Sequence, residues 1–203
     1  MRWDRLFADL EARFEELGDA EEAAERADRA RVAVGAVHAT QRLAGSVGGS
    51  VRVRLAGGPS IGGSLRSVGP DWLLVTEAFG RDCMVALGAI TAVEGLTAAT
   101  GQELNGLAVR FDLRRALRGV ARDRSPVAIA LTGWTGGVTG GVAAGTIGSA
   151  GSAEITGTID RVGADFLEVA VHAAWEPRRA AAVRSVVLVP IGAIVLVRAL
   201  PLG

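Results

Sequence analysis

The feature that most constrains this chain is a repeat within it, because residues 63–75 return in altered form as residues 157–169. The first copy reads Gly-Ser-Leu-Arg-Ser-Val-Gly-Pro-Asp-Trp-Leu-Leu-Val and the second reads Gly-Thr-Ile-Asp-Arg-Val-Gly-Ala-Asp-Phe-Leu-Glu-Val. A further similarity follows each copy, since residues 85–93 resemble residues 189–197. Stretches with the same pattern of apolar and turn-forming residues favour the same local structure, so the chain is predicted to contain two similar units.

Each copy carries the alternation of apolar and polar residues that is typical of half-buried strands. Glycine, proline and aspartate cluster between the alternating runs, as at Gly69-Pro70-Asp71, and these residues favour tight turns. The pattern predicts five strands in the first copy, at 51–55, 61–66, 72–75, 83–87 and from 90 on, and five in the second, at 127–131, 155–161, 166–169, 186–191 and 194–197.

Five short strands bury one face of their sheet and lose their exposed edges when the sheet closes on itself. The predicted fold class is therefore α+β, with two tandem five-stranded small β-barrels, Sm-like or SH3-like, joined by a basic helix. The predicted domains are a helical arm at 1–48, a first barrel at 49–95, a connector helix at 96–124, and a second barrel with a long glycine-rich loop at 125–203.

The N-terminal residues are predicted to be helical because their apolar side chains recur at steps of four and three. This apolar stripe consists of Trp3, Phe7, Leu10, Phe14 and Leu17. Gly18 interrupts it, and a second helical pattern follows. Three arrangements stay open: a helical hairpin, a coiled coil in which the stripe is the dimer face, and one continuous mobile helix.

Arginines concentrate in the segment that connects the two copies. A helix is predicted near residues 104–122, with an apolar stripe of Leu113, Ala116, Leu117 and Val120. The candidate contact residues for nucleic acid or another partner are Arg110, Arg114, Arg115, Arg118, Arg122 and Arg124. Residues 1–28 hold ten acidic residues and four arginines, so the remainder of this neutral chain carries a net charge of +6. The basic helix is therefore expected to bind phosphates, to be a solvated face, or to pair with the acidic N-terminal helices.

Few residues in the chain are suited to catalysis. The two histidines and the single cysteine, Cys83, show no spacing that suggests a metal site or a nucleophile with its base. Asp71 and Asp165 occupy equivalent turns, where an aspartate needs no catalytic explanation. We therefore expect no enzymatic activity, no cofactor and no metal.

The expected location is the cytoplasm. The start, Met1-Arg2-Trp3-Asp4, leads directly into a charged helix and has no signal-peptide pattern. No segment is apolar over the roughly 18 residues that a membrane helix needs. We expect no membrane partner.

The repeat resembles the Sm-like fold. Its first motif is matched by Val51, Val53, Leu55, Gly63, Leu65 and Asp71, and its second by Gly88 and Ile90. The residues that bind RNA bases in that family are replaced here by Trp72-Leu73-Leu74 and by Leu87, so the resemblance implies the fold and not the RNA site. It is also compatible with PRC-type barrels.

The opening of the chain, Met1 to Glu11, is similar to that of a family of uncharacterised actinobacterial proteins. Some of them are automatically labelled as Fis-family transcriptional regulators, which implies a C-terminal helix-turn-helix. Here residues 186–202 show a strand pattern. The expected function is therefore a non-enzymatic scaffold or protein-interaction module, whose partner is a protein or a second copy of the chain bound through the N-terminal helices. The alternative is a nucleic-acid-binding regulator.

Overall fold

The computed structural model describes residues 2–133, 154–173 and 183–200, without the side chains of residues 2–12, 15 and 30. The glycine-rich loop predicted after residue 131 lies almost wholly outside the described residues, as does most of the loop before residue 185. The chain divides into two compact units, Met1–His38 and Ala39–Gly203.

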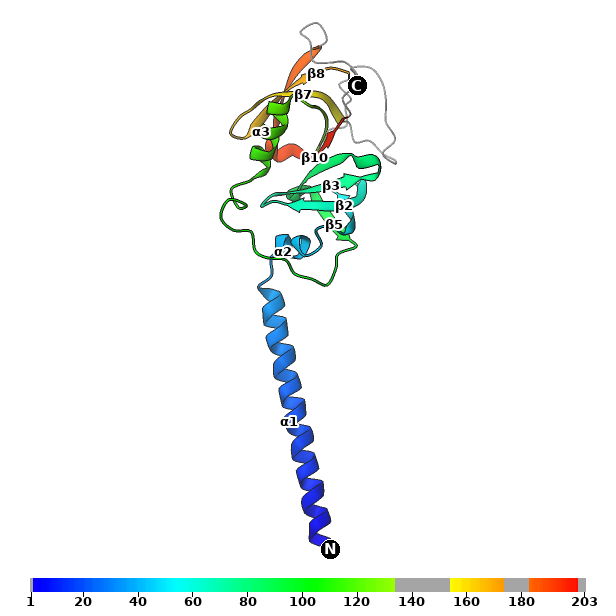
Figure 1. The fold of residues 1–203 in the computed structure, drawn as a ribbon, viewed down its shortest axis with the longest axis vertical. Helices are drawn as coiled ribbons and strands as arrows, with labels where there is room; N and C mark the ends of the chain where they lie inside the picture. The colour runs from blue at the N-terminus through cyan, green and yellow to red at the C-terminus, as the bar shows by residue number, and fades with distance from the viewer. Residues whose placement is uncertain (1, 134–153, 174–182, 201–203) are drawn as a thin grey trace. The chain divides into compact units, whose positions relative to one another are not determined.

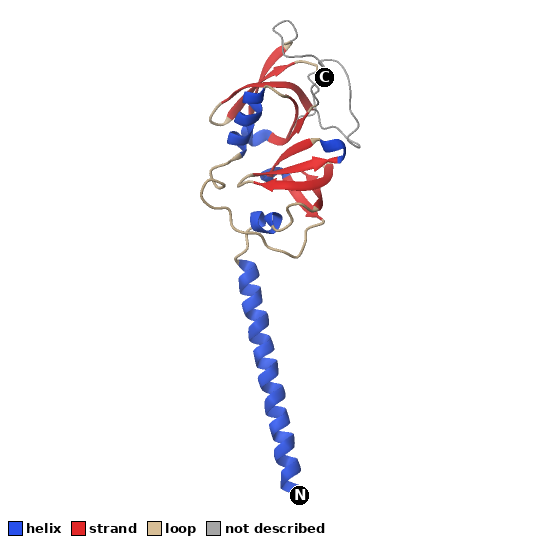
Figure 2. Ribbon diagram, in the orientation of Figure 1, coloured by secondary structure: helices blue, strands red, loops and turns tan. Residues whose placement is uncertain are grey.

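The first unit is one helix, α1 (Arg2–Gly35), which continues through Gly18 (Figure 2). Ion pairs one turn apart join Arg26 to Glu22 and Arg29 to Glu25, and exposed pairs of this kind each stabilise a helix by about 0.3–0.5 kcal/mol. The prediction of a helical hairpin or coiled-coil arm is wrong, because α1 is uninterrupted and its described side chains are exposed. The continuous helix is the alternative observed.

Within its described residues, the second unit contains ten strands, two further α-helices and three short 3₁₀ turns. The elements are α2 (Ala39–Ala44), β1 (Ser50–Leu55), β2 (Ser60–Val68), β3 (Trp72–Glu77), η1 (Ala78–Gly80), β4 (Asp82–Ala86), η2 (Leu87–Ala89), β5 (Ile90–Glu94), α3 (Leu113–Asp123), β6 (Pro126–Leu131), β7 (Glu154–Val162), β8 (Phe166–Val171), β9 (Ser185–Pro190), η3 (Ile191–Ala193) and β10 (Ile194–Ala199). α2 packs on β2, and α3 packs on β7.

All ten strands belong to one antiparallel sheet with the order β5-β1-β2-β3-β4-β10-β6-β7-β8-β9 (Figure 1). The prediction of two closed Sm-like or SH3-like barrels joined by a helix is wrong. β4 pairs with β10, which places Val85 opposite Leu196 and Cys83 opposite Arg198. This pairing, here called the β4–β10 junction, merges the two predicted barrels into one open sheet.

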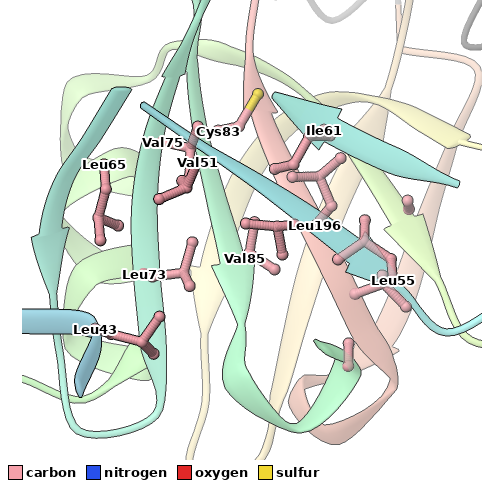
Figure 3. Close-up of a cluster of buried hydrophobic side chains, with 14 residues drawn as sticks. Leu43, Val51, Leu55, Ile61, Leu65, Leu73, Val75, Cys83, Val85 and Leu196 are labelled. Carbon is pink, nitrogen blue, oxygen red and sulfur yellow. The ribbon is translucent and has the colours of Figure 1, made fainter. Parts of the chain in front are cut away.

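The prediction that the repeat forms separate tandem units is also wrong, because the two strand sets share their buried cores. Leu196 and Val195 of β10 lie in the cluster formed mainly by β1–β4, where Figure 3 shows Leu196 beside Val85 and Leu55. Trp72 of β3 in turn lies in the second cluster, formed mainly by α3 and β6–β10. Each core is therefore completed by residues from the other strand set.

The longest strands, β2 and β7, bend at equivalent places. The pairing register shifts between Leu65 and Ser67 in β2 and between Ile159 and Arg161 in β7, and such bulges sharpen the local twist of a sheet. A Cβ atom at Gly63 would overlap the carbonyl oxygen of Thr76 on β3. The glycine that begins the sequence repeat therefore allows the close approach of two strands.

A buried cation spans the β4–β10 junction. Arg198 is 5% exposed, and its guanidinium donates to Glu77 Oε2 at 3.2 Å and to Glu154 Oε1 at 2.9 Å. Burial alone lowers the pKa of Arg198, but the carboxylates of Glu154 and Glu77 outweigh this effect and raise it. One charged side chain thus connects β10 to both β3 and β7.

We expect Arg198→Ala to lower the free energy of unfolding by about 3 kcal/mol, since it leaves two partly buried carboxylates without their cation. Chemical denaturation followed by circular dichroism measures this loss. The matched control is Arg54→Ala, which breaks a surface ion pair with Glu94. The Arg54 and Glu94 side chains are 54% and 49% exposed, so this loss should be less than about 1 kcal/mol. Equal losses in the two variants would contradict a stabilising role for the buried cation.

Candidate functional site

The predicted basic segment forms a shorter helix than expected, α3 (Leu113–Asp123), and its arginines lie largely on the outer surface. The exposed members are Arg110, Arg115, Arg118, Arg122 and Arg124, while Arg114 is half-buried. We call this set of five exposed residues the arginine face. Arg110 precedes the helix, and Arg124 ends it in a left-handed conformation with φ of 52°.

The opposite side of α3 is apolar and fixes the orientation of the helix. Leu113, Ala116 and Leu117 are buried in the second core cluster, together with Ile129 and Ile159 of the sheet. Residues three and four apart lie on the same side of a helix, so burying this stripe places the arginines outward. The amphipathic pattern seen in the sequence therefore determines which side of α3 faces solvent.

Two aspartates satisfy the free amides at the start of α3. Asp112 Oδ1 accepts from the Arg115 amide at 2.8 Å, as an N-cap residue does. Asp71 Oδ1, from the turn between β2 and β3, accepts from the Leu113 amide at 2.7 Å. The sequence identified Asp71 only as a turn residue, and only the tertiary structure shows that it also caps a helix 42 residues away along the chain.

The residue after Asp71 holds the segment that leads into α3. Trp72 Nε1 donates to the Phe111 carbonyl oxygen at 2.8 Å. The two rings meet edge to face, with their centroids 5.8 Å apart, a favoured aromatic geometry. The β2–β3 turn of the first strand set thus fixes the position of the helix that packs on the second set.

Within the described residues, the arginine face makes hydrogen bonds to backbone carbonyls and no ion pairs. Arg115 Nη1 donates to the carbonyl oxygen of Arg110 at 3.0 Å, and Arg118 Nη2 donates to that of Gly163 at 3.4 Å. These contacts orient the guanidinium groups but leave their charge in place. The nearest described ion pair is that of the half-buried Arg114 with Asp112, at 3.7 Å.

The second set of predicted site residues lies on α1. Phe14 is 72% exposed and Leu17 is 66% exposed, on the same side of the helix. The side chains of Trp3, Phe7 and Leu10 lie outside the described residues. The two residues of the predicted packing face whose side chains are described are therefore open to solvent.

The remaining candidates for chemistry are held in structural contacts. Burial raises the pKa of the Cys83 thiol to about 12, and the charge of Glu77 acts in the same direction, against Arg198. At neutral pH Cys83 therefore carries its proton and is a poor nucleophile. His172 is buried, with Nδ1 2.9 Å from the Ala173 carbonyl oxygen and Nε2 2.8 Å from the Thr158 hydroxyl. Because the carbonyl can only accept, Nδ1 donates and Nε2 accepts from the hydroxyl.

Sequence reasoning also missed an aromatic residue that is almost fully exposed. Phe79, in the connection between β3 and β4, is 98% exposed and has φ of 67°. It borders an open hollow of about 520 Å³ that Gly80, Arg81, Ala199 and Leu200 also line. Its exposure depends on the turn geometry, for which the sequence pattern gave no signal.

Two general findings bear on the function. None of the described helices is both long and apolar enough to cross a membrane. Comparison with models of protein families, with curated proteins and with solved structures finds no match.

We expect Asp71→Ala to lower the free energy of unfolding by about 1 kcal/mol, since the variant leaves a helix amide without its acceptor. Asp165→Ala is the matched control, because Asp165 occupies the equivalent turn and, among the described residues, only its backbone carbonyl accepts a hydrogen bond, from the Ile191 amide. Thermal and urea unfolding of both variants measure the difference. An Asp71→Ala variant as stable as Asp165→Ala would show that this cap contributes nothing.

Proposed function

We propose that the protein is a non-enzymatic interaction module that binds a partner protein through the apolar stripe of α1. The observation that carries this proposal is the exposure of Phe14 and Leu17, 72% and 66%, on a helix whose other described positions nearby are mostly charged or alanine. Covering apolar side chains stabilises a complex by about 25 cal/mol for each Å² of apolar surface that the partner removes from water. Two of them one turn apart offer a continuous contact.

The chemistry of α1 indicates what the partner presents. An amphipathic helix typically binds by placing its apolar side in a groove of the partner. An acidic residue continues this side of the helix, since Glu21 lies one turn after Leu17 and is exposed. The partner is therefore a protein with an apolar groove and basic residues on its rim, and the sheet unit serves as the scaffold that carries α1. We place this interaction in the cytoplasm.

We expect the double variant Phe14→Ser, Leu17→Ser to lose at least 80% (roughly 1 kcal/mol or more of binding free energy) of the partner captured by the wild-type chain. The measurement is affinity capture of the full chain from its native cell extract, quantified by mass spectrometry. The matched control is Glu16→Ser, Asp19→Ser, on the opposite side of the same helix.

Capture that the stripe variant reduces and the control leaves intact would support the proposal. Equal capture by wild type and the stripe variant would contradict it. Circular dichroism of each variant distinguishes lost binding from lost helix, because it measures helix content directly. The two variants place serines at the same spacing, so their effects on helix stability should be similar.

A second candidate function is nucleic-acid binding by the arginine face. The specific observation in its favour is that Arg115, Arg118 and Arg122 are all exposed on one short helix whose start is fixed by Asp71 and Asp112. Arginine guanidinium groups bind phosphate oxygens, and contacts of this kind position a protein on a nucleic-acid backbone.

If this second function holds, a short DNA duplex of mixed sequence binds the chain at low salt and dissociates as salt rises. Arg115→Ala, Arg118→Ala and Arg122→Ala together should make the slope of log K against log salt shallower by about 0.9 for each phosphate contact removed. Fluorescence anisotropy with a labelled duplex measures both quantities.

The matched control removes the same charge from β1 and β2 through Arg52→Ala, Arg54→Ala and Arg66→Ala, all exposed in the structure. A control triple that weakens binding as much as the α3 triple would assign the effect to net charge and not to α3. Absence of any binding at low salt would remove this candidate.

A further inference from the structure

The two strands at the ends of the sheet, β5 and β9, resemble in sequence the two strands that pair at its centre, β10 and β4. In the described part of the chain, β5 and β9 each have a single neighbouring strand, β1 and β8 respectively. The sequence similarity between residues 85–93 and 189–197 aligns β9 with β4 and β10 with β5. The β4–β10 junction therefore pairs the counterparts of the two free edges.

The central junction buries side chains whose counterparts at the ends are exposed. Leu196 and Val197 of β10 are 2% and 3% exposed, whereas their counterparts on β5 are the exposed Ala92 and the half-buried Val93. Met84 of β4 is half-buried against the second core cluster. Its counterpart on β9, Leu188, is 60% exposed.

The free edge of β9 is unusually apolar. The strand reads Ser-Val-Val-Leu-Val-Pro, has no charged residue, and exposes Val186 and Leu188 by 58% and 60%. Sheet edges are normally protected by charged residues or by short strands, because their free amides and carbonyls pair readily with another strand. Pro190 removes an amide only at the end of β9, and no other described strand pairs with the outer edge, so most of its backbone groups can pair with another strand.

We infer that copies of this chain associate head to tail, with β9 of one copy pairing antiparallel with β5 of a second copy in the register of the β4–β10 junction. The junction pairs Val85 with Leu196, Met84 with Val197, and Cys83 with Arg198. The corresponding pairs between copies are Val189 with Ala92, Leu188 with Val93, and Val187 with Glu94. This surface is separate from α1 and from the arginine face, so the inference does not depend on either proposed function.

The side chains of the two edges fit this register. Leu188 would lie against Val93, which packs on the first core cluster, as Met84 lies against Val197 at the second. Glu94 brings no unpaired charge, because it accepts a hydrogen bond from Arg54 Nε on the adjacent strand at 2.6 Å. Ala92 is smaller than Leu196, so the contact between copies buries less apolar surface than the internal junction does.

The geometry also predicts the form of the assembly. A contact between two different edges leaves one β9 and one β5 free at the ends of each pair, so further copies add by the same contact. The product is a closed ring or an open filament, and its size increases with concentration.

Two variants of the full chain that each add one cysteine to the native Cys83, Leu188→Cys and Val93→Cys, test the register. Directly opposite residues in antiparallel strands have Cα atoms about 4.5–5.5 Å apart, within the range that a disulfide spans. Mild oxidation of the mixed variants should give a disulfide-linked dimer that contains one chain of each, and neither variant alone should give one. The wild-type chain controls for Cys83, which is buried.

Sedimentation velocity over a range of concentrations tests the assembly itself. The wild-type chain should form species larger than one chain, and Leu188→Arg should shift the distribution to single chains by at least about tenfold in dissociation constant. The matched control is Leu107→Arg, at an 82% exposed position that belongs to no strand, which should leave the distribution unchanged.

Three results would overturn the inference. A disulfide-linked dimer of Leu188→Cys alone would indicate that β9 pairs with β9. The second is the absence of a mixed dimer although both variants melt like wild type, and the third is a wild-type chain that sediments as a single chain at every concentration. If Val93→Cys is unstable, Glu94→Cys with Val187→Cys tests the next pair in the same register.

Discussion

The pairing of β4 with β10 is the interaction on which the rest of this structure depends. It joins two sets of five strands, places Leu196 in the first core cluster, and brings Arg198 between Glu77 and Glu154. A desolvated guanidinium is costly unless carboxylates surround it, so the ion pairs favour this register over a neighbouring one. A shift by one residue would point Arg198 to the other face of the sheet and remove it from both carboxylates.

The same joining of the strand sets positions the surfaces available for binding. Because β3 and β4 lie next to the second core, the turn that carries Asp71 and Trp72 reaches the start of α3 and fixes it. The apolar side of α3 then faces the sheet, and the arginine face turns outward. Stability and recognition share residues here, since the contacts that complete the core also orient the charged surface. The edges of β5 and β9 that no described strand pairs with follow from the same arrangement, because the junction pairs β4 with β10 and leaves their counterparts β9 and β5 at the ends of the sheet.

Local patterns were sufficient to locate the strands but not to pair them. Alternation of apolar and polar residues around Val51 and Val53, with turns at glycine and proline, indicated each strand. Alternation specifies which face of a strand is buried, whereas the identity of the neighbouring strand depends on contacts between residues far apart in the chain. Gly18 illustrates the same limit in a helix: it was expected to interrupt α1, but a single glycine costs only about 1 kcal/mol, which neighbouring ion pairs and good helix formers offset. Of the candidate site, the exposure of the arginines was predictable from the amphipathic pattern, and the cap by Asp71 was not.

The sequence by itself determined the elements: which segments are strands, where turns fall, and which side of α3 is apolar. It did so because these properties arise from interactions within a few residues, namely side-chain periodicity and the backbone preferences of glycine, proline and aspartate. Only the tertiary structure decided that the two strand sets form one open sheet. Two closed barrels and one merged sheet satisfy the same alternation, and the choice between them depends on the buried contacts of Leu196 and Arg198 with residues more than a hundred positions earlier in the chain.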